Sequence, residues 1–135
     1  MTLEKQDKKA LSDVRMAKAW EFLEDARANL REGRHKTAIN RSYYSALSAV
    51  RAILILEGAN PETHEGVVTM LSLRFIKPGL LPVDIVKNFK VLLSRRSDVD
   101  YGDFDTISER DAADSIKLTG EIIELIEIVR RNLMA

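Results

Sequence analysis

Two neighbouring arginines near the end of a predicted helix form the segment of this sequence best suited to chemistry. Arg95 and Arg96 are followed closely by Asp100 and Tyr101. A guanidinium group can donate two parallel hydrogen bonds to a phosphate, so this segment could bind one. The structural alternative is that the arginines interact with the negative end of the helix dipole or with the aspartates that follow. Tyr101 is expected on a loop, where a modifying enzyme or a nucleotide could reach it.

A second candidate is His64, in the segment 63–67 that reads Thr-His-Glu-Gly-Val. The histidine side chain titrates near neutral pH, so His64 could act as a base, an acid or a ligand. A lone histidine can equally be a structural residue. The other histidine, His35, is far away in the sequence, whereas a zinc site needs three or four ligands. We therefore predict no metal site and no cofactor.

Arg41 and Tyr44, one turn apart on another predicted helix, form a third candidate site. This helix has a core face that includes Tyr43, and a second stripe of aromatic and basic side chains roughly 140° away, taking 100° per residue. In the functional interpretation, Arg41 and Tyr44 line a cleft or a dimer contact. In the structural interpretation, Arg41 stacks on Tyr44.

The composition argues against several classes of function. Basic and acidic side chains number 21 each, so the formal net charge is zero, and the basic excess of a dedicated nucleic-acid binder is missing. The chain has no cysteine, which excludes disulfides, thiolate nucleophiles and cysteine metal sites. There is no signal-peptide pattern and no apolar stretch long enough for a membrane span. We therefore expect a cytoplasmic protein that does not enter a membrane.

Helices must position these candidates, because apolar side chains recur at spacings of three and four and nowhere alternate. We predict five helices, at about 9–31, 35–57, 61–75, 83–94 or a little beyond, and from Thr106 or Ser108 to about 132. Asn60 and Pro61 are expected to begin the third helix, as cap and first-turn residue. Residues 97–105 are expected to form a loop, because five of them are Asp or Gly.

The predicted fold class is all-α: an up-and-down four-helix bundle with an additional short helix. Residues 1–8 are expected to be a flexible N-terminal tail. Residues 9–133 are expected to form a single domain, because a chain of 135 residues suits one core.

In their order and spacing, the motifs resemble those of the HEPN family of small helical bundles, which is named as a nucleotide-binding domain. They are Asn40-Arg41-Ser42-Tyr43-Tyr44, the segment 63–67, and Arg96-x-x-x-Asp100-Tyr101. The last is similar to the Arg-x-x-x-Asp-Tyr signature of small stand-alone prokaryotic members. The resemblance covers about residues 10–130.

The resemblance implies several functional features. Members commonly form homodimers around a shared cleft, and many are encoded beside a nucleotidyltransferase-fold protein with which they form a toxin–antitoxin pair. Some members are metal-independent ribonucleases whose motif is Arg, four to six residues and then His, often followed by Tyr. Some nucleotidyltransferase partners silence the toxin by attaching AMP to that tyrosine, which would be Tyr101 here.

The chain departs from the ribonuclease motif at its histidine. Arg95-x4-Asp100-Tyr101 has an aspartate at that place, and an aspartate is ionised at neutral pH and therefore a poor proton donor. Its charge would also repel the scissile phosphate. His64 would have to replace the missing histidine. The motif arginine stays open, because Arg96 fits the Asp-Tyr signature and Arg95 fits the ribonuclease spacing.

Three functions are compatible with these observations. The favoured one is a binding module, a homodimer that pairs with a nucleotidyltransferase-fold protein and binds a nucleotide. Its phosphate-binding residues would be Arg41, Tyr44, His64, Arg95 and Arg96. The alternative is a metal-independent ribonuclease toxin acting on RNA, in which Arg95 or Arg96 holds the phosphate and His64 or Asp100 transfers protons. The third is a structural helical dimer without a site, in which His64 is buried.

Overall fold

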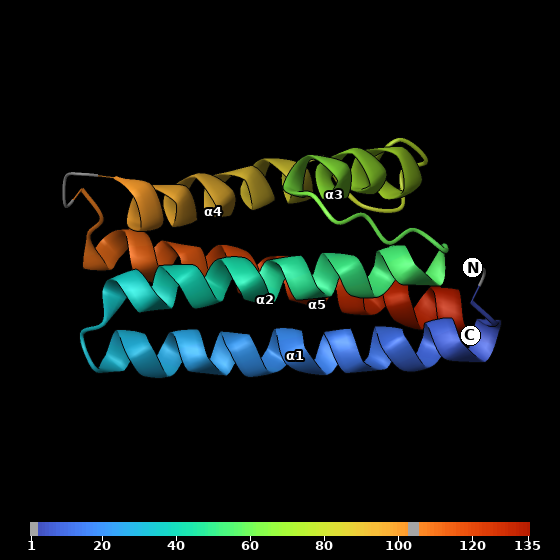
Figure 1. Cartoon of the computed structure of the whole chain (residues 1–135), viewed down its shortest axis with the longest axis horizontal. Coiled ribbons are helices and arrows are strands. Elements are labelled where there is room, and N and C mark those ends of the chain that lie inside the picture. The colour runs from blue at the N-terminus through green and yellow to red at the C-terminus, as the bar shows by residue number, and fades with distance from the viewer. Residues whose placement is uncertain (1–2, 103–105) are drawn as a thin grey trace.

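The protein folds into an all-α bundle. The computed structural model describes residues 3–102 and 106–135, and these contain no strand and no helix long and apolar enough to cross a membrane. The elements in chain order are α1 (Lys5–Arg31), α2 (His35–Leu56), α3 (His64–Leu71), the π-helical turn η1 (Ser72–Ile76), α4 (Asp84–Tyr101) and α5 (Glu109–Met134). Figure 1 shows the long helices lying lengthwise, with α3 in the same layer as α4. The predicted up-and-down four-helix bundle with an additional short helix is therefore confirmed.

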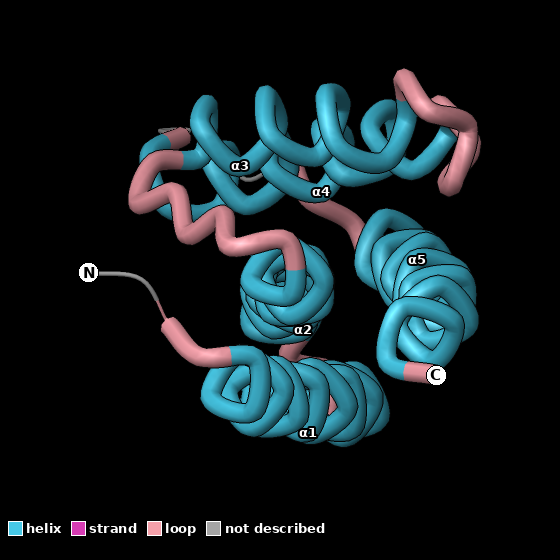
Figure 2. Tube along the Cα trace, turned by 90° about the vertical axis from the view of Figure 1, so that its right-hand side faces the viewer, coloured by secondary structure: helices cyan, strands magenta, loops and turns pink. Residues whose placement is uncertain are grey.

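Helix α2 occupies the centre of the bundle. Viewed along the bundle, it is surrounded by α1, α5 and the layer of α3 and α4 (Figure 2). The sequence of α2 explains this position, because 12 of its 22 residues are buried and many of these are alanine or serine. Small side chains let the neighbouring helices pack closely on several sides of α2.

Buried hydroxyl groups fix how the outer helices align with α2. Ser45 Oγ donates to the Ala19 carbonyl of α1 at 2.5 Å, and Thr119 Oγ1 of α5 donates to the Ser42 carbonyl at 2.9 Å. A buried hydroxyl without a partner costs free energy, so each of these bonds favours one alignment of the neighbouring helix.

The first helix begins earlier than the sequence predicts. α1 starts at Lys5, so residues 5–8 of the expected flexible tail are helical. The apolar stripe of the first helix does not extend to residues 5–8, so the sequence pattern does not predict that they are helical. The lysines of this turn line a hollow together with Leu56 of α2 and Leu133 of α5.

The third helix begins later than predicted and has a different cap. Asn60 and Pro61 precede α3, and Thr63 is its cap, with Oγ1 accepting a hydrogen bond from the Gly66 amide at 2.9 Å. Threonine is among the residues preferred at this position. A side chain at Gly66 would come within 3.0 Å of both Pro61 and Thr63, which explains the glycine.

The segment predicted as a loop at 97–105 is helical as far as Tyr101, where α4 ends. Two features hold this acidic stretch in the helix. One is an ion pair between side chains one turn apart on α4, and the other is the packing of Val99 against a small buried cluster of α2 and α5. Tyr101 is therefore on the end of a helix and not on a loop. Residues 103–105 of the predicted loop lie outside the described residues.

Ser108, one of the two predicted caps, begins α5. Its Oγ accepts a hydrogen bond from the Asp111 amide at 3.1 Å, and the Asp111 carboxylate accepts one from the Ser108 amide at 3.0 Å. The hydrogen bonds that the Ser108 amide and hydroxyl donate to the Asp111 carboxylate stabilise its ionised form and lower the pKa of Asp111. This capping box fixes the first turns of α5 opposite the second half of α4.

Candidate functional site

A shallow groove lies between the start of α3 and the second half of α4. It has a volume of about 630 Å³ and is lined by Thr63, His64, Glu65, Leu93, Arg96, Ser97 and Tyr101. Three residues singled out from the sequence, His64, Arg96 and Tyr101, therefore come together here. The cap at Thr63 places His64 in the first turn of α3, and the unbroken α4 carries both Arg96 and Tyr101.

Arg96 is the central cation of this groove, with a side chain 16% exposed. Its Nη2 donates to the Tyr44 hydroxyl oxygen at 3.0 Å, and its Nε lies 3.0 Å from Asp100 Oδ2. The guanidinium carbon lies 5.7 and 5.5 Å from the ring centres of Tyr43 and Tyr44, within the range of a cation–π interaction. Nε is buried and makes no hydrogen bond in the described structure, because its hydrogen is not directed at Asp100. Arg96 is thus held in place while part of its donor capacity stays unused.

His64 is exposed, contrary to the structural interpretation in which it is buried. Its Nδ1 is hydrogen-bonded to the hydroxyl of the buried Tyr43. Burial raises the pKa of Tyr43, although the charge of Arg96 opposes this rise. The hydroxyl therefore keeps its proton, and it can donate to Nδ1 or accept a hydrogen bond from Nδ1–H, depending on the tautomer of His64. Nε2 of a neutral His64 is a donor where Tyr43 donates to Nδ1, and an acceptor where Nδ1–H donates to Tyr43.

Arg95 points toward α5 and does not line the groove. Its Nη1 lies 2.9 Å from Asp114 Oδ2 and donates to Ser115 Oγ at 3.0 Å and to the Asp111 carbonyl at 3.4 Å. These contacts join α4 to the capped first turns of α5. The two neighbouring arginines are therefore divided between two places, with Arg96 in the groove and Arg95 between two helices.

Arg41 also lies apart from the residues that line the groove. Its guanidinium carbon lies 5.7 Å from the ring centre of Phe22, and the ring centres of Phe22 and Tyr44 are 6.4 Å apart. Arg41 thus stacks on Phe22, and Arg96 takes the place over Tyr44 that the sequence suggested for Arg41. Arg41 is connected to the groove through two aromatic rings.

Tyr43 is a residue of this candidate site that the sequence analysis does not select, because its periodicity predicts only packing in the core. A buried tyrosine usually finds a hydrogen-bond partner, and this rule is the signal that could have found it. Its partner could not be identified from the sequence, because His64 is 21 residues away on another helix.

The groove combines a cation, a hydrogen-bond donor and an accessible phenol. Arg96 and His64 can both donate to an anion such as a phosphate. Tyr101 is 76% exposed, so its hydroxyl can be reached from outside. Among the described residues, no group of three or more His, Cys, Asp or Glu side chains is arranged to hold a metal ion. The arrangement is therefore suited to binding phosphate and to presenting a hydroxyl.

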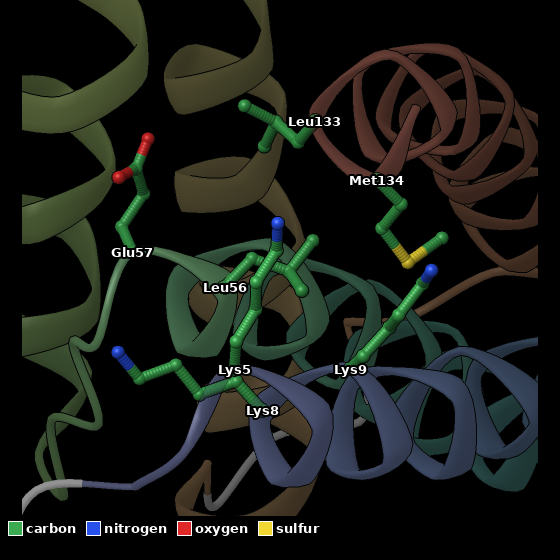
Figure 3. Close-up of a pocket in the computed structure, with 7 residues that line it drawn as sticks. All are labelled: Lys5, Lys8, Lys9, Leu56, Glu57, Leu133 and Met134. Atoms are coloured by element: carbon green, nitrogen blue, oxygen red, sulfur yellow. The ribbon is translucent and has the colours of Figure 1, made fainter.

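A second hollow, of about 460 Å³, lies beside the first turn of α1 (Figure 3). It is lined by Lys5, Lys8, Lys9, Leu56, Glu57, Leu133 and Met134. In Figure 3 the lysine side chains extend from α1, and Leu133 and Met134 come from the end of α5. None of the lining residues is a histidine, tyrosine or arginine, so this hollow lacks the combination of groups found in the groove.

The fold and the groove together define a small helical-bundle protein with a surface suited to an anion. The HEPN domain model matches residues 12–129 of this chain. The chain therefore belongs to the HEPN domain family, as the order of its motifs suggests.

Relatives of the chain include proteins from bacteria and archaea. A UPF0332 protein from Thermotoga maritima is 27% identical over 121 residues, which are 90% of this chain and 92% of the relative. A UPF0332 protein from Pyrococcus horikoshii is 38% identical over 61 residues, or 45% of this chain and 43% of the relative. A Methanocaldococcus jannaschii protein named "Putative toxin MJ0142" is 34% identical over 64 residues, or 47% of this chain and 44% of the relative. The last two similarities span less than half of each relative.

Proposed function

We propose that this protein is the HEPN component of a two-component module of the toxin–antitoxin type, and that a nucleotidyltransferase-fold partner acts at its groove. Membership of the HEPN family and the toxin names of two Methanocaldococcus jannaschii relatives support this function. The observation that carries the proposal is the position of Tyr101, which is 76% exposed and lines the same groove as Arg96 and His64.

In this proposal Tyr101 accepts an adenylyl group. Its hydroxyl oxygen attacks the α-phosphorus of ATP held by the partner, the bond from that phosphorus to the bridging oxygen breaks, and pyrophosphate leaves. The phenol proton passes to a base of the partner. Arg96 stabilises the phosphate that becomes attached to Tyr101, because a charge-assisted hydrogen bond from a guanidinium is stronger than a neutral one.

Nucleotide binding by the groove rests on Arg96 and His64. Both line the groove, and both side chains carry N–H groups of the kind that bind a phosphate. Tyr44 holds Arg96 in position through its hydroxyl. Arg41 and Arg95 take no part in this proposal, because they contact Phe22 and Asp114 instead.

Capture of the partner, followed by mass spectrometry of the captured chain, tests this function. The tagged full chain, expressed in its native cells, is expected to recover a nucleotidyltransferase-fold protein and to gain the mass of one adenylyl group on Tyr101. Tyr101→Phe should abolish the gain and leave the fold intact, because the side chain is exposed. Tyr44 is an internal control that should stay unmodified, because it is partly buried. Recovery of neither a partner nor an adenylylated chain would reject the proposal.

A ribonuclease is the second candidate, because the fold brings His64 into the same groove as Arg96. His64 would then replace the histidine that is missing at Asp100. The hydrogen bond with Tyr43 occupies Nδ1, so Nε2 is the ring nitrogen of His64 that would transfer a proton to or from RNA. One imidazole cannot be base and acid in the same step, so this second candidate needs a further proton-transfer group.

Incubation of the pure protein with mixed RNA in the absence of metal tests this second function. Cleavage by the wild type should be lost in Arg96→Ala and in His64→Ala. Arg95→Ala is the comparison, because Arg95 lies outside the groove. Cleavage that persists in both groove variants would show that the groove is not the site of cleavage.

The predicted homodimer is a separate part of the proposal. Light scattering of the purified full chain over a range of concentrations is expected to give the mass of two chains. A mass of one chain throughout would remove the homodimer from the proposal and leave the test of Tyr101 unaffected.

A further inference from the structure

Two arginines meet at the seam of α1 and α2, beside the segment that connects α2 to α3. Arg15 Nη2 donates to Asn60 Oδ1 at 2.9 Å, and Arg51 Nη2 donates to the same oxygen at 3.4 Å. Arg15 Nη1 also donates to the Arg51 carbonyl at 3.2 Å. Figure 2 shows this side of the bundle, where the connecting segment passes beside α2 above α1. A single amide oxygen therefore lies between two guanidinium groups.

The positive charges of these two arginines are not neutralised by the described residues. The buried Arg130 and the partly buried Arg95 and Arg96 each have a carboxylate within 3.0 Å, from Asp13, Asp114 and Asp100 respectively. Arg41, also partly buried, lies against the Phe22 ring instead. Within the described chain, no carboxylate pairs with Arg15 or Arg51, and an amide oxygen carries only a partial negative charge. Burial lowers the pKa of Arg15, and the charge of Arg51 lowers it further. Like charges are thus held together at a free-energy cost.

The Nε atom of Arg51 adds a further free-energy cost at this place. It is buried and makes no hydrogen bond in the described structure. A buried donor without a partner costs free energy, so packing alone does not explain the arrangement. The amide nitrogen of Asn60 adds a further donor, because its oxygen is the atom that faces the arginines.

We propose that Arg15, Arg51 and Asn60 form an anion site that binds a phosphate monoester. Two guanidinium groups match the two negative charges of such a phosphate, whereas a carboxylate carries one. The site shares no residue with the groove of His64, Arg96 and Tyr101. It therefore binds phosphate independently of any modification of Tyr101.

Titration of the ¹⁵N-labelled full chain with inorganic phosphate, at constant ionic strength, tests the site. The NMR signals of the Nε–H groups of Arg15 and Arg51 are expected to shift and to saturate. Arg51→Gln should weaken phosphate binding at the Arg15 signal by roughly tenfold or more, because it removes a charge-assisted donor. Arg27→Gln is the matched control on α1, because Arg27 is exposed and already pairs with Glu24 at 2.5 Å; this variant should bind like the wild type.

Asn60→Asp separates ligand binding from structure, because it places a carboxylate between the two arginines without changing the shape of the side chain. This variant should be more stable to heat than the wild type and should lose the saturable phosphate shift. Unchanged phosphate binding by Asn60→Asp, or shifts that do not saturate in the wild type, would overturn the proposal.

Parallel titrations with AMP, adenosine and acetate distinguish the sources of the phosphate. Equal affinities for AMP and inorganic phosphate would assign the site to phosphate itself, and tighter binding of AMP would assign it to the phosphate of a nucleotide. Adenosine should not shift either arginine signal. Acetate that binds as tightly as phosphate would contradict a site for a doubly charged anion.

Discussion

Two partly buried arginines, Arg130 and Arg96, occupy similar depths in the bundle but have different surroundings. Arg130, with a side chain 10% exposed, joins α5 to α1 through Asp13 at 2.6 Å and also contacts Glu127 at 3.0 Å. Arg96, with a side chain 16% exposed, has one carboxylate, that of Asp100, at 3.0 Å. Its other neighbours are two tyrosine rings and an open groove.

This difference separates a structural cation from one that can still bind. The charge of Arg130 is balanced by two carboxylates, which raise its pKa against the opposing effect of burial. Arg96 has a single carboxylate partner and lines a groove with an accessible phenol. Burial of an arginine therefore does not by itself reveal its role, whereas the number of its acidic partners and the space beside it do.

The largest effect on stability is expected at Arg130. Arg130→Gln should lower the free energy of unfolding by about 2–3 kcal/mol, because it breaks charge-assisted hydrogen bonds and leaves Glu127, whose side chain is 18% exposed, without its nearest cation. Urea denaturation followed by circular dichroism measures this loss. Phosphate binding in the groove should be unchanged. A loss below about 0.5 kcal/mol would mean that the ion pairs of Arg130 contribute no more than exposed ion pairs do.

The next largest effect is expected at Tyr43, beneath the groove. Tyr43→Phe should cost about 1 kcal/mol near neutral pH, because it removes the hydrogen bond to His64. The effect also depends on pH. The pKa of Tyr43 is raised in the folded chain, so its contribution is present below the ordinary pKa of 10.0 and is lost as the pH rises above that value.

Denaturation of the wild type and of Tyr43→Phe at several pH values measures how the contribution of Tyr43 to stability changes with pH. The difference in unfolding free energy between the two proteins should shrink above about pH 10. A difference that grows with pH would mean that the Tyr43 hydroxyl ionises more easily in the folded chain than in the unfolded one.

The sequence predicts the architecture well because the core is periodic. Stripes at helical spacing reveal each long helix, whereas the central position of α2 comes from the structure (Figure 2). The failures lie where local composition disagrees with tertiary contacts. The segment 97–101 is rich in aspartate and yet helical, because Val99 packs on α2 and α5. The first turn of α1 is polar and yet helical, and its lysines line a hollow with residues from the ends of α2 and α5.

The candidate site is predictable in its residue types but not in its geometry. The choice between Arg95 and Arg96 depends on helix phase, since neighbouring side chains point about 100° apart on a helix. Because the sequence predicts that the fourth helix ends near residue 94, it does not predict in which direction Arg95 and Arg96 point. Tyr43 and His64 are 21 residues apart and lie on different helices. No local sequence pattern predicts their contact.

At Arg96 the expected effect on stability is smaller than at Arg130. Arg96→Gln should cost about 1 kcal/mol, because it removes the hydrogen bond to Tyr44 and one ion pair within α4. The same variant should lose adenylylation of Tyr101 and any binding of nucleotide in the groove. Thermal denaturation and intact mass measure the two effects separately. Full adenylylation of Arg96→Gln would show that Arg96 does not stabilise the phosphate on Tyr101.

The smallest effect is expected at Arg95, next to Arg96 in the sequence. Asp114 is 45% exposed, so the coupling between Arg95 and Asp114 should be about 0.5 kcal/mol. A double-mutant cycle of Arg95→Gln and Asp114→Asn measures this coupling, and adenylylation should stay at the level of the wild type in all three variants. A coupling that disappears at high salt would agree with an exposed pair, because dissolved ions screen it. Loss of adenylylation in Arg95→Gln, but not in Arg96→Gln, would show that Arg95 and not Arg96 supports the modification of Tyr101.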